Sequence, residues 1–152
     1  MHVSSQIAAA LQARLSARVA SVGGRVFRSR VHQIADREMP CLLVAFDGES
    51  VAHDQGQRYH PRIQSRTSRW AVVGVVRARG VGTEDLEDAL LALAREVEEA
   101  LLDSEDIGPV HNLALTGTDL QMADEGESPV GYVRLALQAV ARTREGAPAA
   151  PL

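Results

Sequence analysis

Residues 66–102 have the sequence RTSRWAVVGVVRARGVGTEDLEDALLALAREVEEALL and place a predicted strand directly before a predicted helix. The strand covers Arg66 to Ala78, and Gly74 in its middle indicates a bulge or a close approach of another part of the chain. Two glycines then break the strand, and Thr83 can cap the helix that follows. The helix is predicted because its apolar residues recur at helical spacing, at Leu86, Leu90, Leu93, Val97 and Leu101.

Upstream of this stretch the sequence predicts one helix and two shorter strands. Residues 3–21 form an amphipathic helix that ends at Gly23-Gly24, since glycine accepts the left-handed conformation that ends helices. A short strand is predicted over residues 26–31. Cys41 to Phe46 is apolar on both faces, which favours a central position in a sheet. Residues 48–65 are polar and are predicted to form an unusually long loop.

Downstream the sequence predicts two antiparallel strands, residues 113–122 and 130–142, joined by an acidic turn at 124–129. Apolar and polar residues alternate along the second strand, as expected when one face is buried. Residues 146–152 are rich in proline and alanine and are predicted to be a disordered tail, so a single domain covers residues 1–145. The order α-β-β-β-α-β-β predicts an α+β fold, a mostly antiparallel sheet with two helices packed on it.

Length and composition limit the class of protein. The chain has 152 residues, 45% of them hydrophobic, which suits one domain with a real core. Its one cysteine, Cys41, excludes an intrachain disulfide and a four-cysteine zinc site. No apolar stretch is long enough to cross a bilayer, and the N-terminus lacks the apolar region of a signal peptide. We therefore expect a soluble protein made in a reducing cytoplasm, with no membrane partner.

Charge is divided unevenly along the chain. All 16 basic residues are arginine, and the net charge is −4. Residues 1–80 carry 12 arginines and 5 acidic residues, a net +7, whereas residues 81–152 carry 4 arginines and 15 acidic residues, a net −11. One interpretation is a fold with differently charged faces, and the other is head-to-tail association of copies. Sequence-specific nucleic-acid binding is disfavoured, because the chain is acidic overall and has few aromatic residues for base stacking.

No catalytic or cofactor motif is present. His53, Asp54 and His60 could in principle bind a metal, but their spacing matches no known site and solvated surface residues are the simpler interpretation. Cys41 lies in a predicted core strand, where a buried inert thiol is expected. Gly80-Val81-Gly82 precedes a helix as a phosphate loop would, yet acidic residues follow where an anion would sit. We expect no enzyme activity and no cofactor.

The most distinctive charged cluster surrounds the long polar loop and the next strand. It consists of four arginines, Arg58, Arg62, Arg66 and Arg69. These side chains either solubilise an edge strand or form a contact surface for an acidic neighbouring subunit or for phosphate. The acidic turn is the candidate complementary surface, through Asp124, Glu125 and Glu127. The second interpretation predicts that charge reversal at Arg62 and Arg66 changes assembly.

Several segments together resemble the phage tail terminator family, the lambda-like minor tail protein U and its relatives in siphophage and prophage tail modules. The similarity covers about residues 5–143. It includes the N-terminal helix running into Arg25 to Arg30, the Met39-Pro40-Cys41-Leu42-Leu43-Val44 strand, the long polar loop before an Arg/Trp/Val strand, and the acidic helix with Asp85 to Leu90 and Glu96 to Leu101. The most specific part is Leu115-Thr116-Gly117-Thr118-Asp119-Leu120 followed by Glu125-Gly126-Glu127-Ser128-Pro129-Val130-Gly131.

This resemblance implies a structural role without a catalytic site. Members of the family form hexameric rings that cap the tail tube, stop its polymerisation and present a surface to head-completion proteins. It implies as partners other copies of the chain, the tail tube protein and a head-completion protein. It also implies assembly in the bacterial host cytoplasm and a final position at the head-proximal end of the virion tail. The alternatives are a head- or tail-completion (connector) protein and a small metal-dependent enzyme or ligand-binding domain that uses His53, Asp54 and His60.

Overall fold

The computed structural model describes residues 1–28, 33–56, 59–78, 83–103, 105–123 and 129–152. The predicted order of helices and strands is confirmed, and one further strand follows at the end. The elements are α1 (Val3–Arg18), β1 (Val26–Arg28), β2 (Cys41–His53), β3 (Ile63–Arg77), α2 (Thr83–Leu101), β4 (Asn112–Ala123), β5 (Val130–Arg144) and β6 (Ala147–Pro151). Single turns of 3-10 helix lie at Ala20–Val22 and Asp36–Glu38.

All six strands belong to one sheet, whose main order is β1-β2-β3-β5-β4. β1 pairs with β2 in parallel, and the other pairs are antiparallel. The register runs straight across the sheet, so that Leu42 lies opposite Gly74, Gly74 opposite Val133, and Val133 opposite Leu120. β2 therefore lies inside the sheet, as its apolar sequence predicts, and the fold is the expected α+β class.

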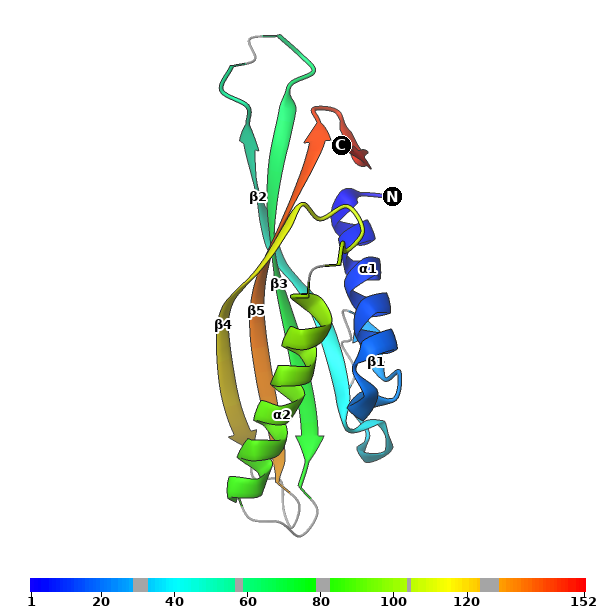
Figure 1. Cartoon of the computed structure of the whole chain (residues 1–152), viewed down its shortest axis with the longest axis vertical. Helices are drawn as coiled ribbons and strands as arrows, with labels where there is room; N and C mark the ends of the chain where they lie inside the picture. The colour runs from blue at the N-terminus through cyan, green and yellow to red at the C-terminus, as the bar shows by residue number, and fades with distance from the viewer. Residues whose placement is uncertain (29–32, 57–58, 79–82, 104, 124–128) are drawn as a thin grey trace.

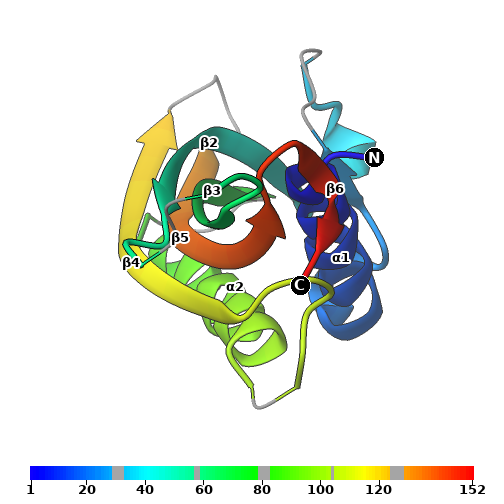
Figure 2. The same cartoon turned by 90° about the horizontal axis from the view of Figure 1, so that it is seen from above.

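Both helices cover the same face of this twisted sheet, as Figures 1 and 2 show from two directions. α1 packs against β1 and β2, whereas α2 packs mainly against β3 and β5. The main core lies between helices and sheet and includes Ile7, Leu11, Leu15, Leu42, Leu90, Val97 and Leu135. A second cluster on the other face surrounds the buried thiol of Cys41, which is confirmed as a core residue.

The first helix is shorter than its apolar pattern suggests. α1 ends at Arg18, and Val19 is already extended, so Val19 and Val22 reach the core from the 3-10 turn that follows. Gly23 then closes this turn in the left-handed region, at a φ of 53°. The predicted glycine stop is therefore in the right place, although the α-helical part ends earlier.

The prediction of a long loop over residues 48–65 is wrong. Residues 48–65 were expected to be a loop, but β2 continues to His53 and β3 begins at Ile63, so most of the stretch forms the two arms of a long hairpin. The register shifts once, between Phe46 and Glu49, and pairing then continues up to His53 opposite Gln64. Polar side chains do not prevent strand pairing here, because backbone hydrogen bonds and the third strand β5 stabilise the ladder.

The prediction of a disordered C-terminal tail is also wrong. Residues 146–152 were expected to be disordered, but Ala147–Pro151 forms β6 and pairs with the end of β5. The Leu152 amide donates to the Arg142 carbonyl at 2.9 Å, and the Gln6 side chain donates to the Ala149 carbonyl at 2.9 Å. Two prolines are compatible with this strand because an edge position does not require every amide to donate.

Candidate assembly surfaces

The sheet order converts the division of charge along the sequence into a division across the molecule. Residues 1–80 contribute β1, β2 and β3, together with α1, to one side of the sheet. Residues 81–152 contribute β5 and β4, together with α2, to the other side. The arginine-rich and acidic halves of the chain therefore lie side by side, and each ends in its own edge of the sheet (Figure 1).

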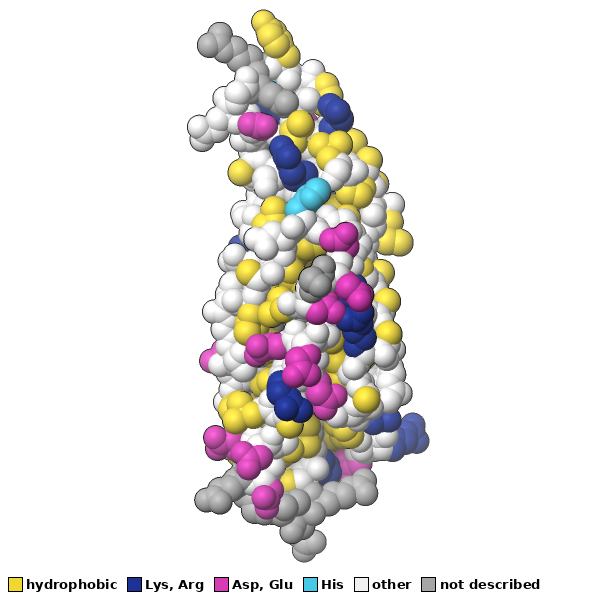
Figure 3. All heavy atoms as spheres, in the orientation of Figure 1, with side chains coloured by type: hydrophobic (Ala, Val, Ile, Leu, Met, Phe, Trp, Pro, Cys, Tyr) yellow, Lys and Arg dark blue, Asp and Glu magenta, His cyan; other side chains and the backbone are white. Residues whose placement is uncertain are grey.

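The acidic side is dominated by α2. The helix sequence contains seven acidic residues and one arginine, and its buried face is apolar. Figure 3 shows acidic side chains gathered over this helix on the face turned to the viewer. The exposed acidic residues of α2 include Asp85, Glu87, Asp88 and Glu99. Only Glu99 has an arginine of the same helix nearby, at 3.7 Å from Arg95. The exposed surface of α2 therefore has a strongly negative electrostatic potential, and it lies beside the β4 edge.

Three of the four predicted contact arginines are described, Arg62, Arg66 and Arg69, and these three do not form one free basic patch. Arg58 lies outside the described residues. Arg66 and Arg69 extend from opposite faces of β3, because residues an odd number apart alternate across a strand. Arg62 and Arg66 are engaged in ion pairs with acidic residues of the same chain. Arg69 is exposed, and its guanidinium is 3.5 Å from the Asp47 carbonyl.

Arg66 organises a nearly buried polar cluster at the base of the hairpin. Its guanidinium donates to Glu49 Oε1 at 2.6 Å, to Thr143 Oγ1 at 2.9 Å and to Gln64 Oε1 at 3.1 Å. The other oxygen of Glu49 accepts from the Ser4 hydroxyl at 2.7 Å. The cluster thereby joins α1, β2, β3 and β5. Arg66 is a structural residue, so reversing its charge would disturb the fold and would not test assembly cleanly.

Near the hairpin tip, the Glu145 carboxylate pairs with Arg62 and His60 and lies close to His53. One of its carboxylate oxygens lies 3.0 Å from Arg62 Nη2, and the other pairs with the His60 ring. Hydrogen bonds from Arg62 and then from His60 lower the pKa of Glu145 from 4.5 to about 2. His53 lies 3.7 Å from the same carboxylate and 3.1 Å from the Gln64 amide. These contacts fasten the tip to the end of β5.

His53, Asp54 and His60, the three residues that could in principle bind a metal, all lie near the hairpin tip, but they do not contact one common partner. His53 and His60 both approach Glu145, whereas Asp54 lies 3.9 Å from Arg142. His53 and Asp54 line an open cavity of about 420 Å³. Within the described parts of the chain, no group of three or more histidine, cysteine or acidic side chains has the geometry to hold a metal ion.

The predicted acidic contact residues cannot be placed. Asp124, Glu125 and Glu127 lie outside the described residues. Their flanking residues are placed, and Ala123 lies opposite Val130, which in turn lies opposite Arg77 at the end of β3. The hairpin tip lies at the other end of β3, beside Ile63.

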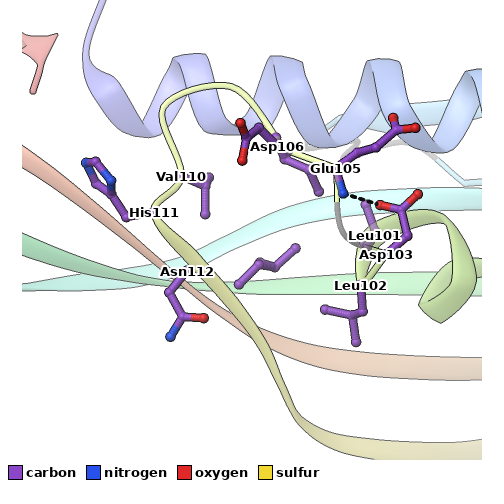
Figure 4. A pocket seen from close by; sticks show the side chains of 10 residues that line it. Leu101, Leu102, Asp103, Glu105, Asp106, Val110, His111 and Asn112 are labelled. Atoms are coloured by element: carbon purple, nitrogen blue, oxygen red, sulfur yellow. Dashed lines mark hydrogen bonds between the residues drawn. The ribbon is translucent and has the colours of Figure 1, made fainter.

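A polar pocket of about 240 Å³ lies where α2 ends and β4 begins (Figure 4). Asp103, Glu105, Asp106, His111 and Asn112 supply its polar lining. Two of these acids also bind the first helix, since Arg14 and Arg18 pair with Asp103 and Glu105. This arrangement attaches α1 to the α2–β4 connection. The arginines of α1 thus partly neutralise these carboxylates, which indicates that the acids of the pocket have a structural role.

An apolar groove of about 340 Å³ was not anticipated from the sequence. It lies between the start of α1 and the edge of β2, and its lining residues are His2, Ser4, Ser5, Ala8, Arg28, Val44, Phe46 and Trp70. Phe46 meets the buried Trp70 edge to face, with ring centroids 5.2 Å apart, yet 48% of Phe46 is exposed. The apolar run that Phe46 ends favours a core position for this residue. In the structure Phe46 is the last residue before the register shift between β2 and β3, and it is half-exposed.

Neither of the described helices is long and apolar enough to cross a membrane. No protein-family model matches the chain, and no curated protein matches it. Among solved structures, the chain is similar to a chain of the virion of a native gene transfer agent (GTA) particle. The two share 17% sequence identity and superpose with a TM-score of 0.55, over 91% of this chain and 94% of the other. This likeness establishes a shared fold.

Proposed function

We propose that this chain is a structural protein of a phage-like particle, and more specifically a tail terminator. The observation that carries the proposal is the similarity of nearly the whole fold to a chain of a gene transfer agent virion. The family resemblance of residues 5–143 points to the same class of protein. In this role the chain closes into a hexameric ring, caps the tail tube, stops its polymerisation and presents a surface for head completion. The role requires no catalytic residue and no cofactor.

The lateral division of charge supports assembly by head-to-tail contacts. An arginine-rich half and an acidic half on opposite sides of the same subunit favour contacts between unlike sides of neighbouring copies. Such heterologous contacts close into rings when the rotation between neighbours divides a full turn evenly. Self-association of this kind is screened by salt, because exposed charges separated by more than about 10 Å hardly interact at 0.1 M ionic strength.

The proposal is tested by the mass of the protein in solution and by its binding to tubes. Light scattering across protein concentration and salt is expected to give a hexamer that dissociates as salt rises. Purified tail tubes are then added, and the expected result is a ring bound at one tube end and an arrest of tube growth. Binding to the portal instead of the tube would indicate a head-completion protein. A monomer that binds neither particle would contradict the proposed role altogether.

A further inference from the structure

β4 forms an unusually unprotected edge of the sheet. Its 12 residues, Asn112–Ala123, pair only with β5 among the strands that the structure describes. The strand contains one charged residue, Asp119, and no proline. Natural proteins usually protect an edge of this length with charges, proline or a cover, because its free amides and carbonyls can pair with another strand. One register shift, between Leu115 and Gly117, interrupts the edge, and the seven residues from Gly117 to Ala123 are paired regularly with β5.

The opposite side of the sheet also offers a partly open edge. β1 pairs with β2 only from Leu42 to Val44. Over Ala45–His53, β2 pairs with β3 on one side, and none of the described strands occupies the other side. This open part of β2 adjoins the apolar groove, because Val44 and Phe46 line both. Within the part of the chain that the structure describes, the sheet therefore has two different open edges at opposite sides.

The directions of these strands suit pairing between copies. β2 and β5 run one way and β3 and β4 run the other, as follows from their antiparallel pairs. When neighbouring copies are related by rotation about an axis along the strands, every copy keeps the same strand directions. β4 of one copy and β2 of the next are then antiparallel. Their pairing would join neighbouring sheets into one continuous sheet and remove both edges, as ring closure does in barrels.

The apolar side chains at the two edges lie on the same face. On β4, Leu120 lies opposite the core residue Val133, so it extends from the face that carries the helices, and so does Met122. These two side chains remain 38% and 43% exposed. On β2, Phe46 extends from the helix-bearing face as well, beside Trp70. In a continuous sheet, the exposed pair on β4 would face the groove of the next copy.

The groove beside β2 and the surface beside β4 carry charges of opposite sign. Arg28 and His2 line the groove, and the first turn of α1, which also borders it, contains no acidic residue. The helix N-terminus adds a partial positive charge there. Beside β4 lies the acidic surface of α2. A second copy of this chain therefore fits the groove better than a basic partner would.

From these observations we propose that β4 of one copy pairs with the open edge of β2 of the next, with Leu120 and Met122 seated in the groove formed by Val44, Phe46 and Trp70. This inference rests on the proposed ring. The inference goes beyond the proposed function by naming the surfaces through which neighbouring copies would meet. An isologous pair in which two β4 strands meet is the competing arrangement, and it would produce dimers because both copies use the same edge.

Disulfide trapping between copies tests the arrangement directly. Cys41 is first replaced by serine, and Gln121→Cys on β4 is combined in turn with Ala45→Cys, Ser50→Cys or Ala52→Cys on β2. All four positions extend from the face opposite the helices, so any pair that comes into register can bond. The expected result is a ladder of cross-linked copies with at least one combination. Cross-linking by Gln121→Cys alone would support the β4–β4 dimer and overturn the proposal.

Point variants test the apolar contact. Leu120→Glu/Met122→Glu and, separately, Phe46→Ser are expected to weaken self-association at least tenfold in light scattering. The thermal unfolding midpoint should stay unchanged for the β4 variant and fall slightly for Phe46→Ser, which loses its packing on Trp70. Tyr59→Glu is the matched control, because Tyr59 is 86% exposed and lies between the ends of β2 and β3, outside both proposed pairing edges. If rings form by mass while the variants assemble normally and no combination cross-links, this contact is wrong and the proposed function stands. If no assembly occurs alone or on tubes, both fail.

Discussion

At the scale of single residues, two glycines determine how closely α2 approaches the sheet. A Cβ atom on Gly74 would lie 2.6 Å from Leu93 Cδ2 and 2.9 Å from Val133 Cγ1. A Cβ atom on Gly131 would lie 2.6 Å from Leu90 Cδ1. The leucines of the α2 stripe thus occupy the space above the glycines. The close approach predicted for Gly74 is confirmed, and the alternative of a bulge is excluded because its pairing is regular.

Gly74→Val is expected to destabilise the protein by roughly 1–3 kcal/mol, because overpacking a filled core displaces neighbouring side chains. Chemical denaturation followed by circular dichroism measures the loss. Gly117→Ala is the matched control, since nothing lies within 4 Å of the position of its Cβ, and it is expected to change stability by less than about 0.5 kcal/mol. Equal stability of Gly74→Val and the parent would show that α2 does not pack as described.

Glu145 is expected to make stability depend on pH in the acid range. Its pKa is lowered from 4.5 to about 2 by Arg62 and His60, so its contribution is complete above pH 4.5 and is lost as the pH falls through this range towards 2. Glu145→Gln should therefore have a lower thermal midpoint than the parent at neutral pH, and the difference should shrink below pH 4.5. Glu87→Gln, on the exposed face of α2, serves as the control. A difference that stays constant down to pH 2 would contradict the pairing.

At the scale of elements, the upper hairpin is stabilised by polar contacts more than by apolar packing. The main core lies beneath the helices, whereas the hairpin rises beyond it (Figure 1). The ion pair of Arg66 and Glu49 connects the hairpin to the start of α1 through Ser4. Each partner of this pair has a side chain only 13% exposed. Removing one partner leaves the other charge poorly hydrated, which is more harmful than removing both.

Arg66→Met is therefore expected to destabilise the protein by about 3 kcal/mol, and Arg66→Met/Glu49→Met should recover most of that loss. Equilibrium denaturation in urea measures both. Arg69→Met, an equivalent change on the exposed face of the same strand, is expected to cost less than about 0.5 kcal/mol. A double variant as unstable as Arg66→Met alone would mean that Arg66 contributes through packing and not through its charge.

At the scale of the whole molecule, the proposed head-to-tail assembly depends on the acidic surface of α2. Glu87 lies on the exposed face of α2 beyond its first turn, so a change there alters the surface field with little effect on the helix end. Its neighbours on that face are also acidic. A charge reversal at Glu87 would therefore test the surface field, since none of the described residues forms an ion pair with Glu87.

Glu87→Lys is expected to weaken self-association several-fold at low salt and to leave it unchanged at high salt, where exposed charges are screened. Sedimentation or light scattering at both salt concentrations measures the effect. Asp54→Lys, at the hairpin tip, makes the same change in net charge away from α2 and should leave association nearly unaltered. Equal effects of both variants would point to net charge alone and not to a specific acidic edge.

Part of the candidate surface could be predicted from the sequence and part could not. The charge division, the acidic helix and the buried state of Cys41 follow from composition and periodicity. The groove does not, because it depends on where β1 ends beside β2 and on the exposure of Phe46. The role of Arg66 was also missed, since its partners Glu49 and Thr143 are remote in sequence.

The sequence by itself determined the order of α1, α2 and strands β1 to β5, which sides of these elements are apolar, and how charge is divided along the chain. These properties are local, since they depend on repeats of 3.6 and 2 residues. Only the tertiary structure decided the strand order that places the charged halves at opposite edges, and the docking of residues 147–151 on β5. The reason is physical: strand pairing joins residues far apart in the chain through backbone groups that every residue shares. Partners are therefore selected by the packing of the whole molecule.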